Sequence, residues 1–109
     1  MLDTDAIQSA VDRMVAKAGS PSRVILFGSY ARGAANTGSD LDLLVIEREI
    51  PDKGAEYMRL LDALGRVAPG VGVDLLLYPL NEFERRSLVP GNVLYHARRE
   101  GKILHDSIS

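Results

Sequence analysis

The chain has 109 residues, enough for one domain of common size, and 46% of them are hydrophobic, as in ordinary globular proteins. Its 13 basic and 15 acidic residues leave a formal net charge of −2, which disfavours a protein that binds nucleic acid on its own. It contains no cysteine, which excludes disulfides and thiolate metal sites, and no apolar run approaches the ~20 residues needed to span a membrane. We therefore expect one cytoplasmic domain over residues 1–109 that does not associate with membranes.

The first predicted element is an amphipathic helix, because apolar residues recur at three- and four-residue steps over residues 7–18. Thr4 or Asp5 is expected to cap its start, and Gly19 is expected to end it. The apolar run over residues 24–27 then predicts a buried strand.

Gly28 and Ser29 interrupt this strand, and residues 30–32 are expected to form a short helical turn. Residues 33–39 are small and polar, which predicts a loop. The branched residues over 41–46 predict a second strand.

A second amphipathic helix is predicted over residues 57–68, because its apolar residues again follow helical spacing. Pro69 and Gly70 are expected to close this helix. The apolar run over residues 71–78 predicts a third strand.

Two short helices and a last strand complete the pattern. Asn81 is expected to cap the first helix, with Glu84 at the capping-box position. Asn92 is expected to cap the second helix, which ends before Gly101, and residues 102–105 to form an edge strand. This alternation predicts an α/β (α+β) domain in which helices cover a small sheet.

Two aspartates at the start of the second strand are the first candidates for chemistry. Asp40 and Asp42 are two residues apart, so in a strand their carboxylates point to one side. Two unpaired carboxylates at one point repel each other, and a divalent cation removes that conflict. A carboxylate site without nearby histidine or cysteine favours Mg²⁺ or Mn²⁺ over zinc.

The turn after the first strand supplies a matching anion site. A glycine at position 28 lets another group approach the backbone closely, and a helical turn from Ser29 offers N–H groups and a hydroxyl to a phosphate. Together with the two aspartates, this predicts a site for a metal-bound nucleoside triphosphate. Arg32 either contacts a phosphate or pairs with an acidic neighbour on the surface.

Asp74 is the candidate for a third carboxylate, because it interrupts an otherwise apolar strand. An ionised carboxylate buried there needs a compensating ligand, since its burial costs several kcal/mol. If its strand lies beside the second strand, Asp74 joins Asp40 and Asp42. The alternative is an aspartate at a strand edge that faces solvent or an arginine. His96 and His105 have no partner pattern and are expected to be solvated.

The pattern Gly28-Ser29-x(10)-Asp40-x-Asp42, followed by Asp74, resembles the DNA polymerase β-type nucleotidyltransferase superfamily. The amino-acid sequence of residues 27–33 and 39–43 is similar to that of its minimal nucleotidyltransferase branch. The resemblance implies the nucleotidyltransferase fold, a small mixed β-sheet flanked by α-helices. It also implies nucleotide phosphates on Gly28 and Ser29 and metal on Asp40 and Asp42. Asp74 would be the third ligand and would help to deprotonate the acceptor hydroxyl.

Members of this branch typically pair with a small helical HEPN protein that resembles a ribonuclease toxin. They act as antitoxins that transfer AMP from ATP to a tyrosine hydroxyl of the toxin. The resemblance therefore implies a Mg²⁺-dependent protein adenylyltransferase in a hetero-oligomer with such a partner. Two alternatives stay open: a non-catalytic subunit that neutralises its partner by binding, and a stand-alone transferase acting on a small molecule or an RNA end.

Overall fold

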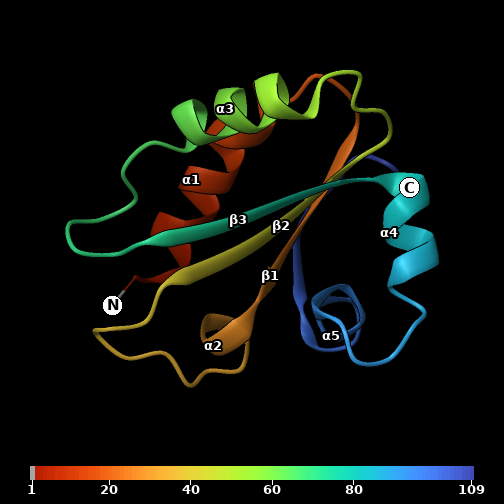
Figure 1. The fold of residues 1–109 in the computed structure, drawn as a ribbon. Coiled ribbons are helices and arrows are strands. Elements are labelled where there is room, and N and C mark those ends of the chain that lie inside the picture. The colour runs from red at the N-terminus through yellow and green to blue at the C-terminus, as the bar shows by residue number, and fades with distance from the viewer. Residues whose placement is uncertain (1) are drawn as a thin grey trace.

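The computed structural model describes residues 2–109 and contains a four-stranded mixed sheet. The strands lie in the order β3 (Val73–Pro79), β2 (Leu41–Glu47), β1 (Ser22–Phe27) and β4 (Lys102–Asp106) (Figure 1). β1 is antiparallel to both of its neighbours, whereas β2 and β3 run parallel. The predicted fold class is confirmed, and β3 lies beside β2 at one edge of the sheet.

Helices cover both faces of this sheet. α1 (Thr4–Val15) and α3 (Lys53–Leu64) pack on one face, and α4 (Leu80–Arg86) and α5 (Val93–Glu100) pack on the other (Figure 1). The short α2 (Gly28–Ala31) follows β1 directly. Parallel strands need a crossover between them, and α3 provides it for β2 and β3. Within residues 2–109, no helix has both the length and the apolar character that crossing a membrane requires.

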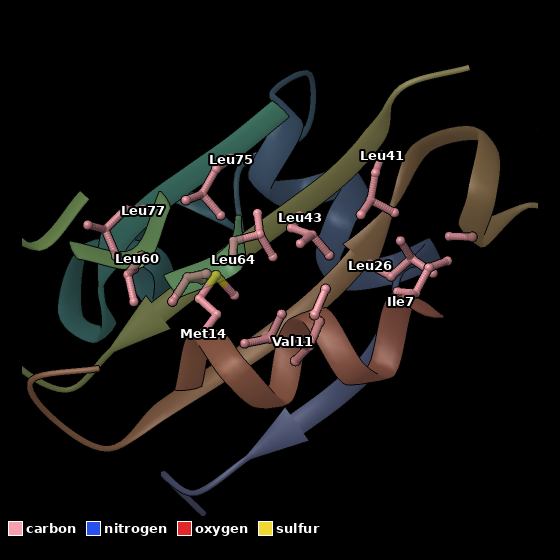
Figure 2. Close-up of a cluster of buried hydrophobic side chains, with 14 residues drawn as sticks. Ile7, Val11, Met14, Leu26, Leu41, Leu43, Leu60, Leu64, Leu75 and Leu77 are labelled. Carbon is pink, nitrogen blue, oxygen red and sulfur yellow. The ribbon is translucent and has the colours of Figure 1, made fainter. Parts of the chain in front are cut away.

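The larger core lies between the sheet and the α1–α3 pair (Figure 2). Side chains alternate along a strand, so every second residue of β1, β2 and β3 enters this core. Truncating one of its buried leucines to alanine is expected to cost ~2–5 kcal/mol. The helices contribute Ile7, Ala10, Val11 and Met14 from α1 and Leu60 and Leu64 from α3.

The opposite face of the sheet is apolar along most of its length and acidic at one end. Ile25, Leu44 and Ile46 form a second buried cluster there with residues of α4 and α5. Asp42 and Asp74 lie on this same face by strand alternation. The face that α5 covers is therefore the face on which the candidate site opens.

Helix α1 is shorter than its apolar pattern predicts. Asp3, not Thr4 or Asp5, is the N-cap, and its carboxylate accepts the N–H of Ala6 at 2.7 Å. The helix ends at Val15 rather than at Gly19. Gly19 instead serves a tertiary contact, because its N–H donates to Glu56 Oε2 at 2.8 Å.

Both ends of α3 and the start of α4 also differ from the prediction. α3 begins at Lys53, capped by Asp52, rather than at residue 57. α3 ends at Leu64, because Gly65 follows with φ 63° and terminates it before Pro69. α4 begins directly after β3 with Pro79 at the N-cap position and no side-chain cap, so the predicted capping box at Asn81 is wrong. The Asn92 cap of α5 is confirmed, since its Oδ1 accepts the N–H of Tyr95 at 3.0 Å.

A buried pair of carboxyl groups joins the far end of β2 to α3. Glu47 is 1% exposed and Glu56 is 6% exposed, and Glu56 also accepts Arg59 Nη1 at 2.8 Å. Burial raises the pKa of Glu47 to about 8, and the adjacent Glu56 carboxylate contributes to the rise. Glu47 Oε2 has no hydrogen-bond partner within residues 2–109, and a proton on this carboxyl group would let it donate to Glu56.

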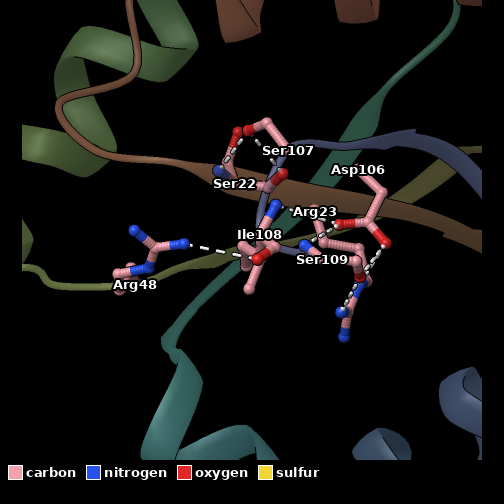
Figure 3. Close-up of polar contacts among 7 residues, drawn as sticks. All are labelled: Ser22, Arg23, Arg48, Asp106, Ser107, Ile108 and Ser109. Carbon is pink, nitrogen blue, oxygen red and sulfur yellow. Dashed lines mark hydrogen bonds and ion pairs between the residues drawn. The ribbon is translucent and has the colours of Figure 1, made fainter.

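Polar contacts attach the C-terminal residues to β1 (Figure 3). Ser107 Oγ accepts the N–H of Ser22 at 2.9 Å, and Arg23 Nε lies 3.2 Å from Asp106 Oδ2. The hydrogen bond from Ser109 is the main reason that the pKa of Asp106 is lowered to about 2. These contacts extend the pairing of β1 with β4 beyond the end of β4.

Candidate active site

Gly28 connects β1 to α2 in a conformation that only glycine adopts readily. Its φ is 72°, and a Cβ atom at this position would overlap Oδ2 of Asp42. The close approach predicted for this position is therefore present, and the group that approaches is the carboxylate of Asp42. Phe27 and Asp42 are cross-strand partners, which fixes this arrangement from the sheet register.

Asp42 and Asp74 are direct partners in the parallel register of β2 and β3. Asp42 is half-buried and Asp74 is exposed. The expectation that Asp74 is buried is wrong, because β3 is an edge strand and one of its sides faces solvent. The expectation that Asp74 lies beside Asp42 required only that β3 be next to β2, and the structure shows this strand order.

The electrostatics of Asp42 reflect this crowding. Burial raises the pKa of Asp42, and the hydrogen bond with Asp74 and the negative charges of Asp74 and Asp40 raise it further. The charge of Arg32 acts in the opposite direction. None of the ion pairs within residues 2–109 involves any of the three aspartates, so Arg32 offsets their mutual repulsion only from a longer distance.

Asp40 precedes β2 and is exposed. It lies against Gly72, where a Cβ atom would be 2.7 Å from Asp40 Oδ1, and the N–H of Leu41 donates to the carbonyl of Gly72 at 2.9 Å. Across residues 2–109, no three acidic, histidine or cysteine side chains gather closely enough to hold a metal ion. The structure thus brings Asp42 and Asp74 together and places Asp40 beside them. The concentration of carboxylates at this point fits a divalent cation.

Ser29 and Arg32 are the other predicted binding residues. Ser29 is half-buried in the first turn of α2, and its carbonyl accepts the N–H of Ala34 at 2.9 Å. Arg32 is exposed at the end of α2, close enough to Asp42 to affect its pKa. The surface ion pair considered for Arg32 is not among the ion pairs of the described chain.

Two hollows meet at this site. The first, of about 390 Å³, contains Asp42 and Asp74 and is bordered by Phe27 and Val93. The second, of about 270 Å³, contains Gly28 and is bordered by the same Phe27 and Val93. A ligand on Gly28 therefore has space on both sides of the Phe27–Val93 pair.

Residues of α5 border the second hollow, although no motif in the sequence marks them. Val93, His96 and Glu100 border the second hollow, and their spacing of three and seven residues puts them on one side of a helix. This spacing is the only signal in the sequence, and it carries no information on which side of the sheet the helix packs. Tyr78, on the face of Asp74, contacts Lys53 and Arg86 through its ring at the other end of β3.

The chain is similar to known proteins along most of its length. Residues 7–99 match the family model of the nucleotidyltransferase domain. Putative protein adenylyltransferase MJ0141 of Methanocaldococcus jannaschii is 38% identical over 58 residues, which cover 53% of this chain and 56% of that protein. Putative protein adenylyltransferase MJ1305 of the same organism is 50% identical over 38 residues, or 35% of this chain and 26% of that protein. The matches thus span less than two thirds of these relatives.

Solved structures share the fold at low sequence identity. A protein described as a putative nucleotidyltransferase from Sulfolobus solfataricus matches with a TM-score of 0.62 and 19% identity, over 94% of this chain and 78% of that chain. A toxin–antitoxin with AMP-PNP matches with a TM-score of 0.59 and 19% identity, over 93% of this chain and 74% of that chain. A variant of the toxin–antitoxin MntA-HpeT matches with a TM-score of 0.61 and 17% identity, over 98% of this chain and 75% of that chain. With the family model covering residues 7–99, this chain belongs to the nucleotidyltransferase domain family.

Proposed function

We propose that this nucleotidyltransferase is a protein adenylyltransferase, which moves AMP from ATP to a hydroxyl of a partner protein. One observation carries the proposal. Asp42 and Asp74 are paired on neighbouring strands, directly against the glycine that begins α2. This pair concentrates negative charge beside a glycine backbone that leaves room for a ligand, which suits a nucleoside triphosphate with its metal ion.

Gly28, Ser29 and Arg32 would bind the phosphates. The first N–H groups of a helix have no intrahelical partner, so the backbone at Ser29 can donate to phosphate oxygens together with its hydroxyl. The exposed Arg32 guanidinium adds a positive charge on the same side as Asp42. These groups hold the donor and orient it toward the aspartates.

Asp40, Asp42 and Asp74 would hold Mg²⁺ or Mn²⁺, since carboxylate oxygens are the ligands that these ions prefer. When bound, the ion neutralises the negative charge of the reacting phosphates. Asp40 has an exposed side chain, which can turn from Gly72 toward the Asp42–Asp74 pair.

Asp74 would also receive the proton of the acceptor hydroxyl. Its exposure at the edge strand lets a hydroxyl of a large partner reach it from solvent. As a carboxylate oxygen of Asp74 takes that proton, the hydroxyl oxygen forms a bond to the α-phosphorus of ATP. The bond from this phosphorus to the β-phosphate oxygen breaks, and pyrophosphate leaves.

The proposed partner is a small helical HEPN-type toxin, and the proposed acceptor is one of its tyrosines. Three observations support this part. The curated relatives are named as putative protein adenylyltransferases, and two structures with the same fold are toxin–antitoxins. The net charge of −2 provides no basic surface excess for binding nucleic acid directly. A protein partner would then supply the acceptor in a hetero-oligomer.

A binding-only antitoxin is the second candidate, favoured by the position of Asp40. Because Asp40 lies against Gly72, the described chain has no ready three-carboxylate cluster. A subunit that neutralises its toxin by contact alone needs no such cluster. The two candidates differ in whether the aspartates matter after the complex has formed.

The test uses ATP labelled at the α-phosphate, Mg²⁺ and a HEPN-type protein from the native host. We expect label on the toxin with the wild-type chain and with Asp62→Asn, an exposed carboxylate on α3. Asp42→Asn and Asp74→Asn are expected to abolish labelling while the complex still forms in size-exclusion chromatography. Neutralisation of the toxin by both variants without any label would establish the binding-only candidate. Label on RNA or small molecules alone would refute a protein acceptor.

A further inference from the structure

The hollow between α2 and α5 differs chemically from the carboxylate site next to it. Its volume of about 270 Å³ is close to the ~300 Å³ at which small-ligand pockets begin, so it fits part of a nucleotide. Apolar side chains form much of its wall, and a few polar groups lie at its rim. The residues that matter here are Phe27, Gly28, Arg32, Val93, His96 and Glu100.

Helix α5 presents two of these residues from a fixed position. Leu94 and Ala97 are each 1% exposed and anchor the helix in the core. His96 and Glu100, one turn apart, therefore border the hollow from a helix that cannot move freely. The ring of Tyr95 meets the His96 imidazole edge-on, with 5.5 Å between centroids, which limits the rotation of the imidazole.

The hollow is continuous with the proposed donor site through shared residues. Gly28 and Arg32, assigned above to the phosphates, are also part of its wall. Phe27 and Val93 border both this hollow and the one that contains Asp42 and Asp74. A nucleotide with phosphates at Gly28 therefore has space for its nucleoside against α5, while the Asp74 side stays open for the acceptor.

We propose that this hollow binds the nucleobase and that His96 and Glu100 determine which base is accepted. The proposal rests on the proposed function for the identity of the ligand as a nucleotide. The imidazole of His96 packs on a face of the base, together with the apolar wall. The Glu100 carboxylate accepts a hydrogen bond from an exocyclic amino group, which adenine carries where guanine has a carbonyl oxygen. An acceptor facing that oxygen is repelled, so the site prefers ATP over GTP.

Calorimetric titration of ATP and GTP into the chain, with Mg²⁺ and no acceptor, tests the proposal. We expect the wild type to bind ATP more tightly than GTP. Glu100→Gln is expected to narrow this preference about tenfold, because an amide can donate to the guanine oxygen. His96→Ala is expected to weaken both nucleotides about tenfold, and His96→Phe to restore binding. Glu84→Gln, the same change on α4 beside a different hollow, keeps the wild-type preference.

The outcomes separate this proposal from the proposed function. His96 and Glu100 are exposed, so their variants are expected to keep the wild-type melting temperature. Unchanged ATP and GTP affinities in Glu100→Gln and His96→Ala would overturn the base site, even if the chain transfers AMP. Failure of the wild type to bind either nucleotide would overturn it as well. A Glu100-dependent preference for ATP without label on any protein would keep the base site and refute the proposed protein acceptor.

Discussion

The Asp42 carboxylate lies so close to Gly28 that no residue with a Cβ atom fits at position 28 without displacing it. Gly28 has φ 72°, and a Cβ atom there would overlap Oδ2 of Asp42. The backbone of the predicted phosphate loop is thus in direct contact with a predicted metal ligand. This contact comes from the register of β1 and β2, in which Phe27 is opposite Asp42.

Replacing this glycine tests the contact, and the chain offers a matched control. Gly33 has φ 70° and no atom within 4 Å of an added Cβ, so Gly33→Ala is expected to cost only the left-handed backbone term of ~1–2 kcal/mol. Gly28→Ala has the same term plus ~1–3 kcal/mol for the displaced Asp42. Urea denaturation measures both. Equal losses in the two variants would show that the Gly28–Asp42 contact is absent in solution.

Relief of the aspartate repulsion should stabilise the metal-free protein. Like charges directly opposite each other on neighbouring strands are destabilising, so Asp74→Asn is expected to raise the free energy of unfolding by about 0.2–1 kcal/mol in EDTA. The same variant is expected to lose AMP transfer. Asp62→Asn, at an exposed position on α3, serves as the control and should change neither quantity. A destabilised Asp74→Asn would indicate that the carboxylate pair does not repel.

Mg²⁺ should stabilise the wild-type chain through the same residues. An ion present at about five times its Kd adds about 1 kcal/mol to the free energy of unfolding. Differential scanning calorimetry with and without Mg²⁺ measures this gain, which should vanish in Asp42→Asn and persist in Asp62→Asn. If Asp42→Asn retains the full gain, the ion binds elsewhere.

The buried carboxyl pair predicts a stability that falls toward alkaline pH. Burial raises the pKa of Glu47 from 4.5 to about 8, so the folded state retains a proton that the unfolded state has lost between these values. Stability from this group is complete below pH 4.5 and is lost as the pH rises toward about 8. The pKa of Glu56 shifts the other way: its burial acts upward, but hydrogen bonds from Glu47 and Gly19 and the charge of Arg59 lower it, so its contribution is lost only in acid.

Glu47→Gln isolates this effect, because an amide is neutral and still donates to Glu56. We expect the melting temperature of the variant to vary less than that of the wild type from pH 4.5 to 8. Glu49→Gln, at an exposed position near the same strand end, should follow the wild type. Parallel curves for wild type and Glu47→Gln would mean that Glu47 is ionised in the folded protein.

Apolar patterns were sufficient to predict β1, β2, β3 and the two long helices α1 and α3, because each of these elements has its own pattern. The boundaries were less predictable where competing groups decide them. Asp3 caps α1 where Thr4 or Asp5 was predicted to do so, and Gly65 ends α3 before Pro69. Such choices depend on backbone angles that neighbouring elements impose.

The spacing of Asp40 and Asp42 could predict a shared direction, but it could not predict the surroundings of Asp74. Exposure of Asp74 follows from strand order, since β3 is at an edge, and strand order is a property of the whole chain. The same holds for His96 and Glu100. Their helical spacing is visible in the sequence, whereas the packing of α5 beside α2 is a tertiary outcome.

Helix α5 reaches the site from a different stretch of chain than the groups it faces. The aspartates and the glycine turn all lie within residues 28–74, whereas α4, α5 and β4 follow as a separate segment that closes on β1. The proposed reaction centre and the His96–Glu100 side of the proposed base site therefore lie in two separate stretches of sequence. Exchanging residues 80–106 between family members would therefore test whether nucleotide preference moves with this segment while the three aspartates and the glycine turn stay unchanged.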